Sequence, residues 1–201
     1  MAYINTKDLK DEEYINSHFI VMCTKKGVIK KTSLEQYSRP RTNGINAITI
    51  REGDQLLSAK MTTGKSQIMM AVKSGKSIRF EEEKVRAMGR TAAGVRGIRL
   101  ANDNDEVVGM ICIDDSESSV LVVSENGYGK RSDIDDYRIT NRGGKGVKTI
   151  NITEKTGSLI SLKNVTDLDD LMVINKSGIT IRIGVDTLRV MGRATQGVKI
   201  I

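Results

Sequence analysis

The sequence repeats one pattern four times, at intervals of about fifty residues. Each repeat begins with a short apolar run, which leads into a polar turn that ends in a glycine. These turn glycines are Gly27, Gly75, Gly127 and Gly178, and successive ones are 48, 52 and 51 residues apart. A repeat of this length indicates an array of similar units that bury their apolar residues against their neighbours, because one short unit cannot bury them alone.

Within each repeat the pattern is that of β-strands. The apolar runs are short and bounded by turn residues, as in strands that are buried on both faces, and they span residues 19–22, 68–72, 120–123 and 171–174. Asn126-Gly127 is a pair that favours a tight hairpin turn. In the first repeat, apolar and polar residues alternate over residues 44–50, as expected for a third strand. Residues 55–61 follow as a fourth strand. The sequence therefore predicts an all-β, propeller-like array of four-stranded antiparallel blades.

We expect residues 1–201 to form a single repeat domain of about four blades. The predicted blades are residues 19–62, 68–113, 120–165 and 171–201, called here the first to fourth units. Residues 1–18 are interpreted as a strand and linker from a preceding blade. If the array closes, residues 2–6 would complete the last blade, which stops after its third strand.

Positive charge is concentrated inside the units. The chain carries a formal net charge of +7, whereas the four units carry +5, +2, +3 and +4. The leader and the links between units, such as residues 114–117 and 167–170, supply the compensating negative charge. Because the bases recur in register with the turn glycines, we expect the fold to place them along one rim, with the acidic links on another.

A regular row of positive charges is suited to the phosphates of duplex DNA. Aromatic residues make up only 3% of the chain, which argues against the stacking surfaces used for single strands. The predicted phosphate contacts are Lys30, Lys31, Arg39, Arg41, Arg79, Arg90, Lys130, Arg131, Arg138, Arg142, Lys145, Arg182 and Arg193. Gly143, Gly144 and Gly146 join them, because glycines let a backbone approach phosphates closely.

Several motifs resemble one known family. The loop Tyr137 to Val147, the segments 85–100 and 190–198, and the stretch 126–131 are similar to the C-terminal domain of the DNA gyrase A subunit. The resemblance covers nearly the whole chain. Residues 140–146 match the last five positions of the family's box Gln-Arg-Arg-Gly-Gly-Lys-Gly, with Thr140 and Asn141 in place of Gln-Arg. The sequence leaves open whether this loop, in the third unit, acts as that box.

The resemblance implies a β-pinwheel, in which neighbouring blades exchange strands. It implies that double-stranded DNA is wrapped around the outer rim, which supports negative supercoiling by an ATP-dependent type II topoisomerase. It also implies an A2B2 holoenzyme, formed with the rest of the gyrase A subunit together with the gyrase B subunit, in the bacterial cytoplasm at the nucleoid. ATP and magnesium are implied for the holoenzyme only, so no cofactor is expected in this chain.

The residues themselves predict no catalytic or metal site. His18 is the only histidine, and Ser74-Gly75-Lys76-Ser77 lacks the earlier glycine of a phosphate-binding loop, where Met70 stands. No apolar stretch is long enough to span a membrane. Cys23 and Cys112 lie in apolar runs and are interpreted as reduced core thiols, in keeping with a cytoplasmic protein.

Two alternatives are compatible with the same sequence features. One is the C-terminal DNA-binding domain of the topoisomerase IV A subunit, which shares the repeat but has a degraded box. The other is a propeller module for protein interaction, whose period is similar. The chain has no tryptophan, and the propeller families with tryptophan-containing signatures are therefore disfavoured.

Overall fold

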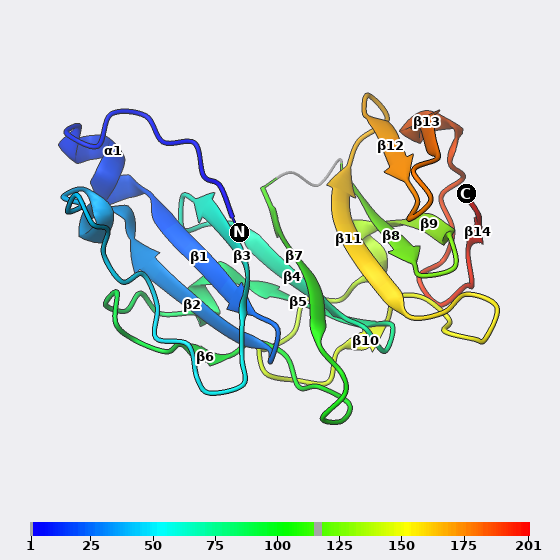
Figure 1. Ribbon diagram of the computed structural model, residues 1–201, viewed down its shortest axis with the longest axis horizontal. Coiled ribbons are helices and arrows are strands. Elements are labelled where there is room, and N and C mark those ends of the chain that lie inside the picture. Colours follow the sequence, from blue (N-terminus) through cyan, green and yellow to red (C-terminus); the bar gives the residue numbers. More distant parts are fainter. Residues whose placement is uncertain (1, 115–117) are drawn as a thin grey trace.

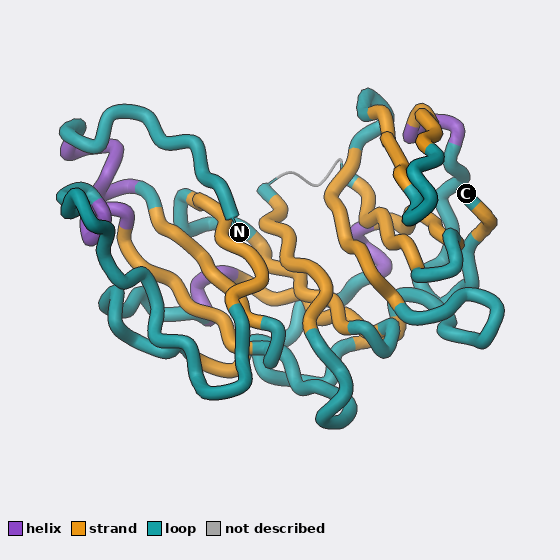
Figure 2. Tube along the Cα trace, in the orientation of Figure 1, coloured by secondary structure: helices purple, strands orange, loops and turns teal. Residues whose placement is uncertain are grey.

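The computed structural model describes residues 2–114 and 118–201, whose regular secondary structure is mostly antiparallel β-sheet. The units follow one another along an arc, from the blue first unit to the orange and red fourth unit (Figure 1). Strands and loops dominate the trace, and the helices are short (Figure 2). The predicted all-β, propeller-like fold is confirmed. Residues 115–117 of one acidic link lie outside the described residues.

Three sheets contain four strands each and share one order. The first sheet has the order β3-β1-β2-β6, with strands Leu56–Thr62, Phe19–Thr24, Val28–Ser33 and Val95–Arg96. The second has the order β7-β4-β5-β10, with strands Val107–Ile113, Gln67–Val72, Lys76–Glu81 and Val147–Lys148. The third has the order β11-β8-β9-β14, with strands Leu159–Val165, Ser119–Ser124, Tyr128–Asp133 and Val198–Lys199. A fourth sheet pairs only β12 and β13, which span Asp170–Ile174 and Thr180–Gly184.

Each four-stranded sheet takes one edge strand from the next unit. β6, β10 and β14 are short strands that follow the polar loops of the second, third and fourth units, and each pairs with the second strand of the unit before it. At the opposite edge, β7 contacts both β3 and β11. The exchanged strands therefore lie on the outer side of the arc and the fourth strands on its inner side (Figure 1).

The first unit differs from this scheme. Residues 44–50, predicted as a third strand, form no strand. Their counterparts in the other units pair with the second strand of the preceding unit, and residues 2–18 form no strand with which residues 44–50 could pair. The predicted strand is wrong for this reason, whereas the predicted fourth strand matches β3 closely.

The apolar runs bury both faces because each central strand lies between two cores. In β4, Ile68 and Met70 belong to a cluster shared with β1, while Met69 and Ala71 belong to a cluster shared with β8. Successive residues of β4 point to opposite faces, and both faces are buried. This burial explains why the run is continuously apolar and does not alternate with polar residues. A smaller cluster, which includes Leu121, joins the third and fourth units.

Cys23 and Cys112 are both free thiols. Cys23 is buried and Cys112 is half-buried. Burial raises the pKa of each thiol to about 12, and the apolar surroundings therefore favour the protonated form.

Short 3-10 helices recur at one place in every unit. Each begins seven residues after the turn glycine, at the end of the second strand. They are η1 (Leu34–Tyr37), η2 (Glu82–Lys84), η3 (Ile134–Asp136) and η4 (Val185–Thr187). In the second, third and fourth units, carbonyl oxygens of these helices accept hydrogen bonds from the preceding unit.

The N-terminal segment packs on the face of the first sheet that points away from the second unit. Ile4 and Leu9 contact a cluster that contains Tyr14, from the α-helix α1 (Glu12–Ser17), and Ile20 of β1. Residues 2–6 form no strand. The hypothesis that they complete the last blade is wrong, because their apolar side chain Ile4 packs on the first unit instead.

Candidate nucleic-acid interface

The predicted phosphate contacts divide into an interior group and an exposed group. Lys30, Lys31, Arg79, Lys130 and Arg131 are buried. These five cations lie on the second strands, whose faces are covered by neighbouring units or, on one face of the first sheet, by the N-terminal segment. The prediction that they meet phosphates does not fit this placement, because their charged ends bind groups inside the protein.

Lys30 and Lys130 occupy equivalent positions, three residues after a turn glycine, and are 0% and 1% exposed. The Lys30 ammonium donates to the carbonyl oxygens of Ala47, at 2.6 Å, and of Arg90. The Lys130 ammonium donates to the Gly192 carbonyl oxygen at 2.6 Å. Burial lowers the pKa of both lysines to about 8. Each lysine therefore ties its strand to the loop of the next unit.

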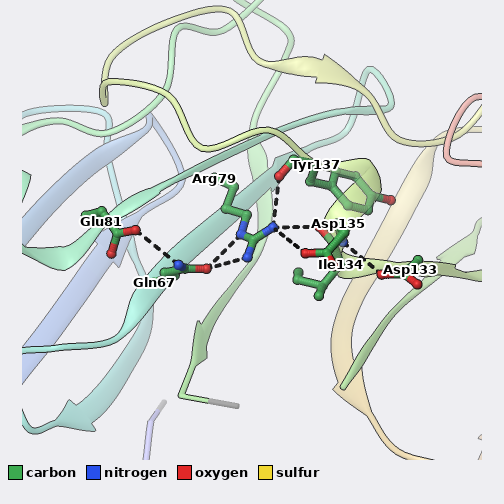
Figure 3. A network of polar contacts seen from close by, with 7 residues as sticks. All are labelled: Gln67, Arg79, Glu81, Asp133, Ile134, Asp135 and Tyr137. Atoms are coloured by element: carbon green, nitrogen blue, oxygen red, sulfur yellow. Dashed lines mark hydrogen bonds and ion pairs between the residues drawn. The ribbon is translucent and has the colours of Figure 1, made fainter. Parts of the chain in front are cut away.

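The base four residues after the turn glycine reaches the 3-10 helix of the next unit. We call Lys31, Arg79 and Arg131 the junction bases. Arg79 has the most complete set of partners (Figure 3). Its Nη1 donates to the carbonyl oxygens of Ile134 at 2.7 Å and Tyr137 at 3.0 Å, while Nε and Nη2 donate to Gln67 Oε1 at 2.8 and 2.5 Å.

The other two junction bases make the same connection with different partners. Lys31 Nζ lies 3.4 Å from the Glu82 carbonyl oxygen and 3.6 Å from Glu82 Oε1, in a buried ion pair. Arg131 Nη1 donates to Asp167 Oδ1 at 2.5 Å and to the Val185 carbonyl oxygen at 3.3 Å. Glu82 and Val185 begin the 3-10 helices of the second and fourth units.

Arg182 is the equivalent residue of the fourth unit. In the described residues its strand β13 pairs with β12 alone, and its side chain is 73% exposed. Its guanidinium binds the Asp170 carboxylate through Nε, at 3.1 Å, and through Nη2. The predicted acidic link 167–170 therefore does not form a separate rim, because Asp167 and Asp170 each bind a base of the repeat.

A second set of arginines follows the turn glycine by fifteen residues. Arg90, Arg142 and Arg193 each donate from Nη1 to a main-chain carbonyl oxygen of the preceding unit, at 2.9–3.2 Å. The three acceptors are Asn46, Arg96 and Lys148, which hold one equivalent position in their units. These guanidinium groups remain half-exposed, so they join the units and still present charge to solvent.

The glycine-rich loop is held against the second unit. The Gly143 N–H donates to the Gly97 carbonyl oxygen at 2.6 Å, and the Gly144 carbonyl oxygen accepts from Arg99 N at 2.8 Å. Gly146 has a φ of +71°, and a Cβ there would lie 2.3 Å from the Ser77 carbonyl oxygen. These glycines therefore serve close approach of one backbone to another. Lys145 is exposed and lines a cleft beside Arg138.

The exposed group contains Arg39, Arg41, Arg138 and Lys145. Within residues 2–114 and 118–201 none of these four side chains has a hydrogen-bond or ion-pair partner. Arg39 and Arg41 belong to the loop of the first unit, whereas Arg138 and Lys145 belong to the loop of the third. They remain candidates for phosphate contacts.

Sequence reasoning missed two sets of exposed cations. Arg86, Arg138 and Arg189 all stand eleven residues after a turn glycine, and only Arg138 was predicted. We call these three the rim arginines; all are exposed, and their side chains have no partner in the described part of the chain. The second set, the strand cations, lies twenty-one residues after the turn glycine and comprises Arg96, Lys148 and Lys199. Both sets recur in register, which is the signal that would have found them.

Both sets follow the outer edge of the sheets. Residues 87, 139 and 190, each next to a rim arginine, form bridges to Lys31, Arg79 and Arg131. The strand cations lie in the exchanged strands β6, β10 and β14. The segment that joins the two sets in each unit therefore borders the second strand of the unit before it, on the outer side of the arc (Figure 1).

The described residues contain neither a metal-binding cluster nor a membrane-spanning helix. No three His, Cys, Asp or Glu side chains within residues 2–114 and 118–201 gather as a metal-binding group. None of the helices in the same ranges combines the length and apolar character that a membrane crossing requires.

The exchanged strands and the repeated junctions define a β-pinwheel, a propeller-like domain with cations along its outer edge. A family model described as the DNA gyrase C-terminal domain, beta-propeller, matches residues 18–63, 66–114, 118–166 and 169–201. The chain belongs to the DNA gyrase C-terminal domain family.

Curated relatives agree with this assignment. The DNA gyrase A subunit of Staphylococcus epidermidis is 45% identical over 198 residues, which cover 98% of this chain and 22% of the relative. The DNA gyrase A subunit of Staphylococcus aureus is 44% identical over 199 residues, with the same coverage. The chain thus spans about a fifth of the length of these relatives.

Solved structures share the fold at low sequence identity. The C-terminal domain of DNA topoisomerase IV matches with a TM-score of 0.86 at 22% identity, covering 92% of this chain and 58% of that one. The DNA gyrase A C-terminal domain matches with a TM-score of 0.85 at 23% identity, covering 100% of this chain and 65% of that one. These likenesses concern the fold alone.

Proposed function

We propose that this chain binds duplex DNA along the outer edge of its sheets, without reading the base sequence, and bends the duplex around the arc. As the C-terminal domain of a gyrase A subunit, it would support negative supercoiling by an ATP-dependent type II topoisomerase. The chain itself would be non-catalytic and would carry no cofactor. Its partners would be the rest of the gyrase A subunit together with the gyrase B subunit, in an A2B2 holoenzyme in the bacterial cytoplasm.

The observation that carries the proposal is the regular recurrence, on one edge, of exposed cations that have no carboxylate partner among the described residues. Each rim arginine extends from a loop that borders the preceding sheet, and each strand cation lies a short distance further along the same edge. Phosphates recur regularly along a duplex, and cations that meet only phosphates position DNA without specifying sequence. A curved row of such cations favours bent DNA over straight DNA.

The half-exposed arginines extend this surface. Arg90, Arg142 and Arg193 each donate from Nη1 to a main-chain carbonyl oxygen of the preceding unit. Arginine has five N–H donors, so the remaining donors can meet a phosphate. With Arg39, Arg41 and Lys145, these residues complete the exposed candidates. Arg182, which binds Asp170, is less suited to a phosphate.

The proposal is tested by the salt dependence of duplex binding. We expect the log of the binding constant to fall with the log of salt concentration, with a slope of roughly −7 if about eight phosphates are neutralised. Replacing the three rim arginines by glutamine should reduce the steepness of the slope by about 3, because each lost phosphate contact removes about 0.9. Mobility-shift titrations at several salt concentrations measure both values.

A matched control separates location from net charge. Lys60 and Lys163 are exposed lysines on the inner strands β3 and β11, and Lys10 is an exposed lysine of the N-terminal segment. Replacing these three by glutamine makes the same change in net charge. Equal losses of slope for the two triple variants would show that the edge is not the binding surface, and a wild-type slope near zero would defeat the proposal.

A further inference from the structure

We propose that the junction bases, and Arg79 above all, are positioning residues that set the angle between neighbouring units and so shape the DNA path. This inference rests on the proposed function. It assigns a role in wrapping to buried cations that do not touch DNA. Loss of Arg79 should therefore impair bending of a long duplex much more than binding of a short one.

The donors of Arg79 are already used inside the protein. Its side chain is 9% exposed, and Nε, Nη1 and Nη2 all donate to protein acceptors. Gln67, which accepts two of these bonds, is held in turn by Glu81 Oε1, at 3.0 Å from Gln67 Nε2 (Figure 3). A guanidinium held on both sides in this way is fixed in orientation and is not free to meet a phosphate.

Arg79 holds the rim arginine of the next unit at two points. Its guanidinium binds the carbonyl oxygen of Tyr137, and its own carbonyl oxygen accepts from Thr140 N at 2.9 Å. Arg138 lies between these two anchored residues. The same residue thus fixes both the angle of the third unit and the position from which Arg138 extends toward solvent.

The backbone half of this arrangement recurs at all three junctions. Met88 N donates to the Lys31 carbonyl oxygen at 2.8 Å, and Met191 N donates to the Arg131 carbonyl oxygen at 2.9 Å. Arg86 and Arg189 each lie two residues before these donors. Each rim arginine is therefore placed by the junction base of the preceding unit.

The side-chain half differs from junction to junction. At the first two junctions the position eight residues before the turn glycine supplies a second partner for the base. At the first junction it is Phe19, whose ring centroid lies 5.0 Å from Lys31 Nζ, and at the second it is Gln67. At the third it is Ser119, and Arg131 Nε is buried there with no hydrogen-bond partner among the described residues. The second junction is thus the most completely bonded, and it lies at the middle of the arc.

The test compares a short and a long duplex on variants of the full chain. The short duplex has about 12 base pairs, roughly one helical turn. The long duplex has about 60 base pairs and carries a donor and an acceptor fluorophore at its ends, so that bending raises energy transfer. The variants are Arg79→Met, Arg79→Lys and Gln67→Ala, with Lys163→Met on the inner strand β11 as the control.

We expect Arg79→Met to bind the short duplex within about twofold of the wild type. On the long duplex, misaligned units can no longer contact the same DNA at the same time. The affinity for the long duplex should therefore fall about tenfold or more, and energy transfer should decrease. Arg79→Lys should share this loss, since an ammonium keeps the charge but not the planar set of donors. Gln67→Ala removes part of the support while keeping the arginine, and should lower energy transfer even if Arg79→Met fails to fold.

Two results would overturn the inference. If Arg79→Met weakens the short duplex as much as the long one and Arg79→Lys restores both, Arg79 is a phosphate contact. If folded Arg79→Met and Gln67→Ala both bend the long duplex like the control, the junction does not set the path. A wild-type chain that binds neither duplex would instead overturn the proposed function, so the two failures are distinguishable.

Discussion

Positive charge has two separate uses in this chain, and neighbouring residues illustrate both. Lys130 and Arg131 are adjacent on β9, and both are buried, one binding the next unit's loop and the other its 3-10 helix. Arg138, seven residues later, is exposed. Buried cations remain charged only where polar acceptors compensate for the loss of water. Here main-chain carbonyl oxygens of the next unit provide that compensation, so the buried charges depend on assembly of the array.

The buried lysines should make stability depend on pH in an unusual direction. Burial lowers the pKa of Lys130 from 10.5 to about 8, an effect that nearby Asp136 opposes and Arg193 reinforces. Between these two values the unfolded chain binds more protons than the folded one. The free energy of unfolding should therefore rise with pH between about 8 and about 10.5. Below pH 8 Lys130 is protonated in both states and adds no pH dependence.

Urea unfolding of wild type and Lys130→Met at pH 7, 8, 9 and 10 measures this contribution. The buried cysteines have the opposite tendency above pH 9, since burial raises their pKa to about 12. They are present in both proteins and cancel in the difference. The difference in unfolding free energy should shift in favour of the wild type as pH rises above 8. A constant difference across this range would contradict a lowered pKa for Lys130.

At the level of elements, the exchanged strand depends on one glycine that precedes it. Gly146 comes just before β10 and lies so close to β5 that a Cβ would be 2.3 Å from the Ser77 carbonyl oxygen. Gly44 occupies the same place in the first unit, with a φ of +82°, and no atom of residues 2–114 and 118–201 lies within 4 Å of the position that its Cβ would take. The two glycines thus share a backbone requirement and differ in the presence of a neighbouring unit.

Substitution of these glycines by alanine should separate the two effects. Gly44→Ala should lower the free energy of unfolding by about 1–2 kcal/mol, the cost of a left-handed conformation for a residue with a Cβ. Gly146→Ala adds a backbone collision and should cost roughly 1–3 kcal/mol more. Urea denaturation of both variants measures this difference. Equal losses would mean that β10 can move away from β5 without cost.

At the level of the whole molecule, wrapping makes a topological prediction. If the duplex follows the curved edge, ligation of nicked plasmid in the presence of the chain should trap linking-number changes of a single sign. The amount trapped should increase with the ratio of protein to DNA. Gel electrophoresis after removal of the protein measures the distribution. Binding without any trapped change would retain duplex binding and exclude wrapping.

The sequence predicted the repeat, the strand class and the buried first strands, because short apolar runs and turn glycines report local structure directly. It did not distinguish buried bases from exposed ones. Lys30 and Lys31 interrupt the apolar pattern as surface residues do, and their acceptors are main-chain carbonyl oxygens of the first and second units, which carry no sequence signature. The strand exchange followed from the family resemblance, since a two-residue strand such as β10 is too short to show a pattern.

The strand exchange also bears on how arrays of this kind change length in evolution. A sheet is completed by a strand of the following unit, so the residues of one folded sheet do not coincide with one repeat of the sequence. A crossover that removes or adds one whole period leaves every sheet that is followed by another unit with an outer strand, wherever in the repeat it falls. A break between two units, in contrast, leaves the upstream sheet without that strand. Gene duplication can therefore lengthen such a protein one period at a time.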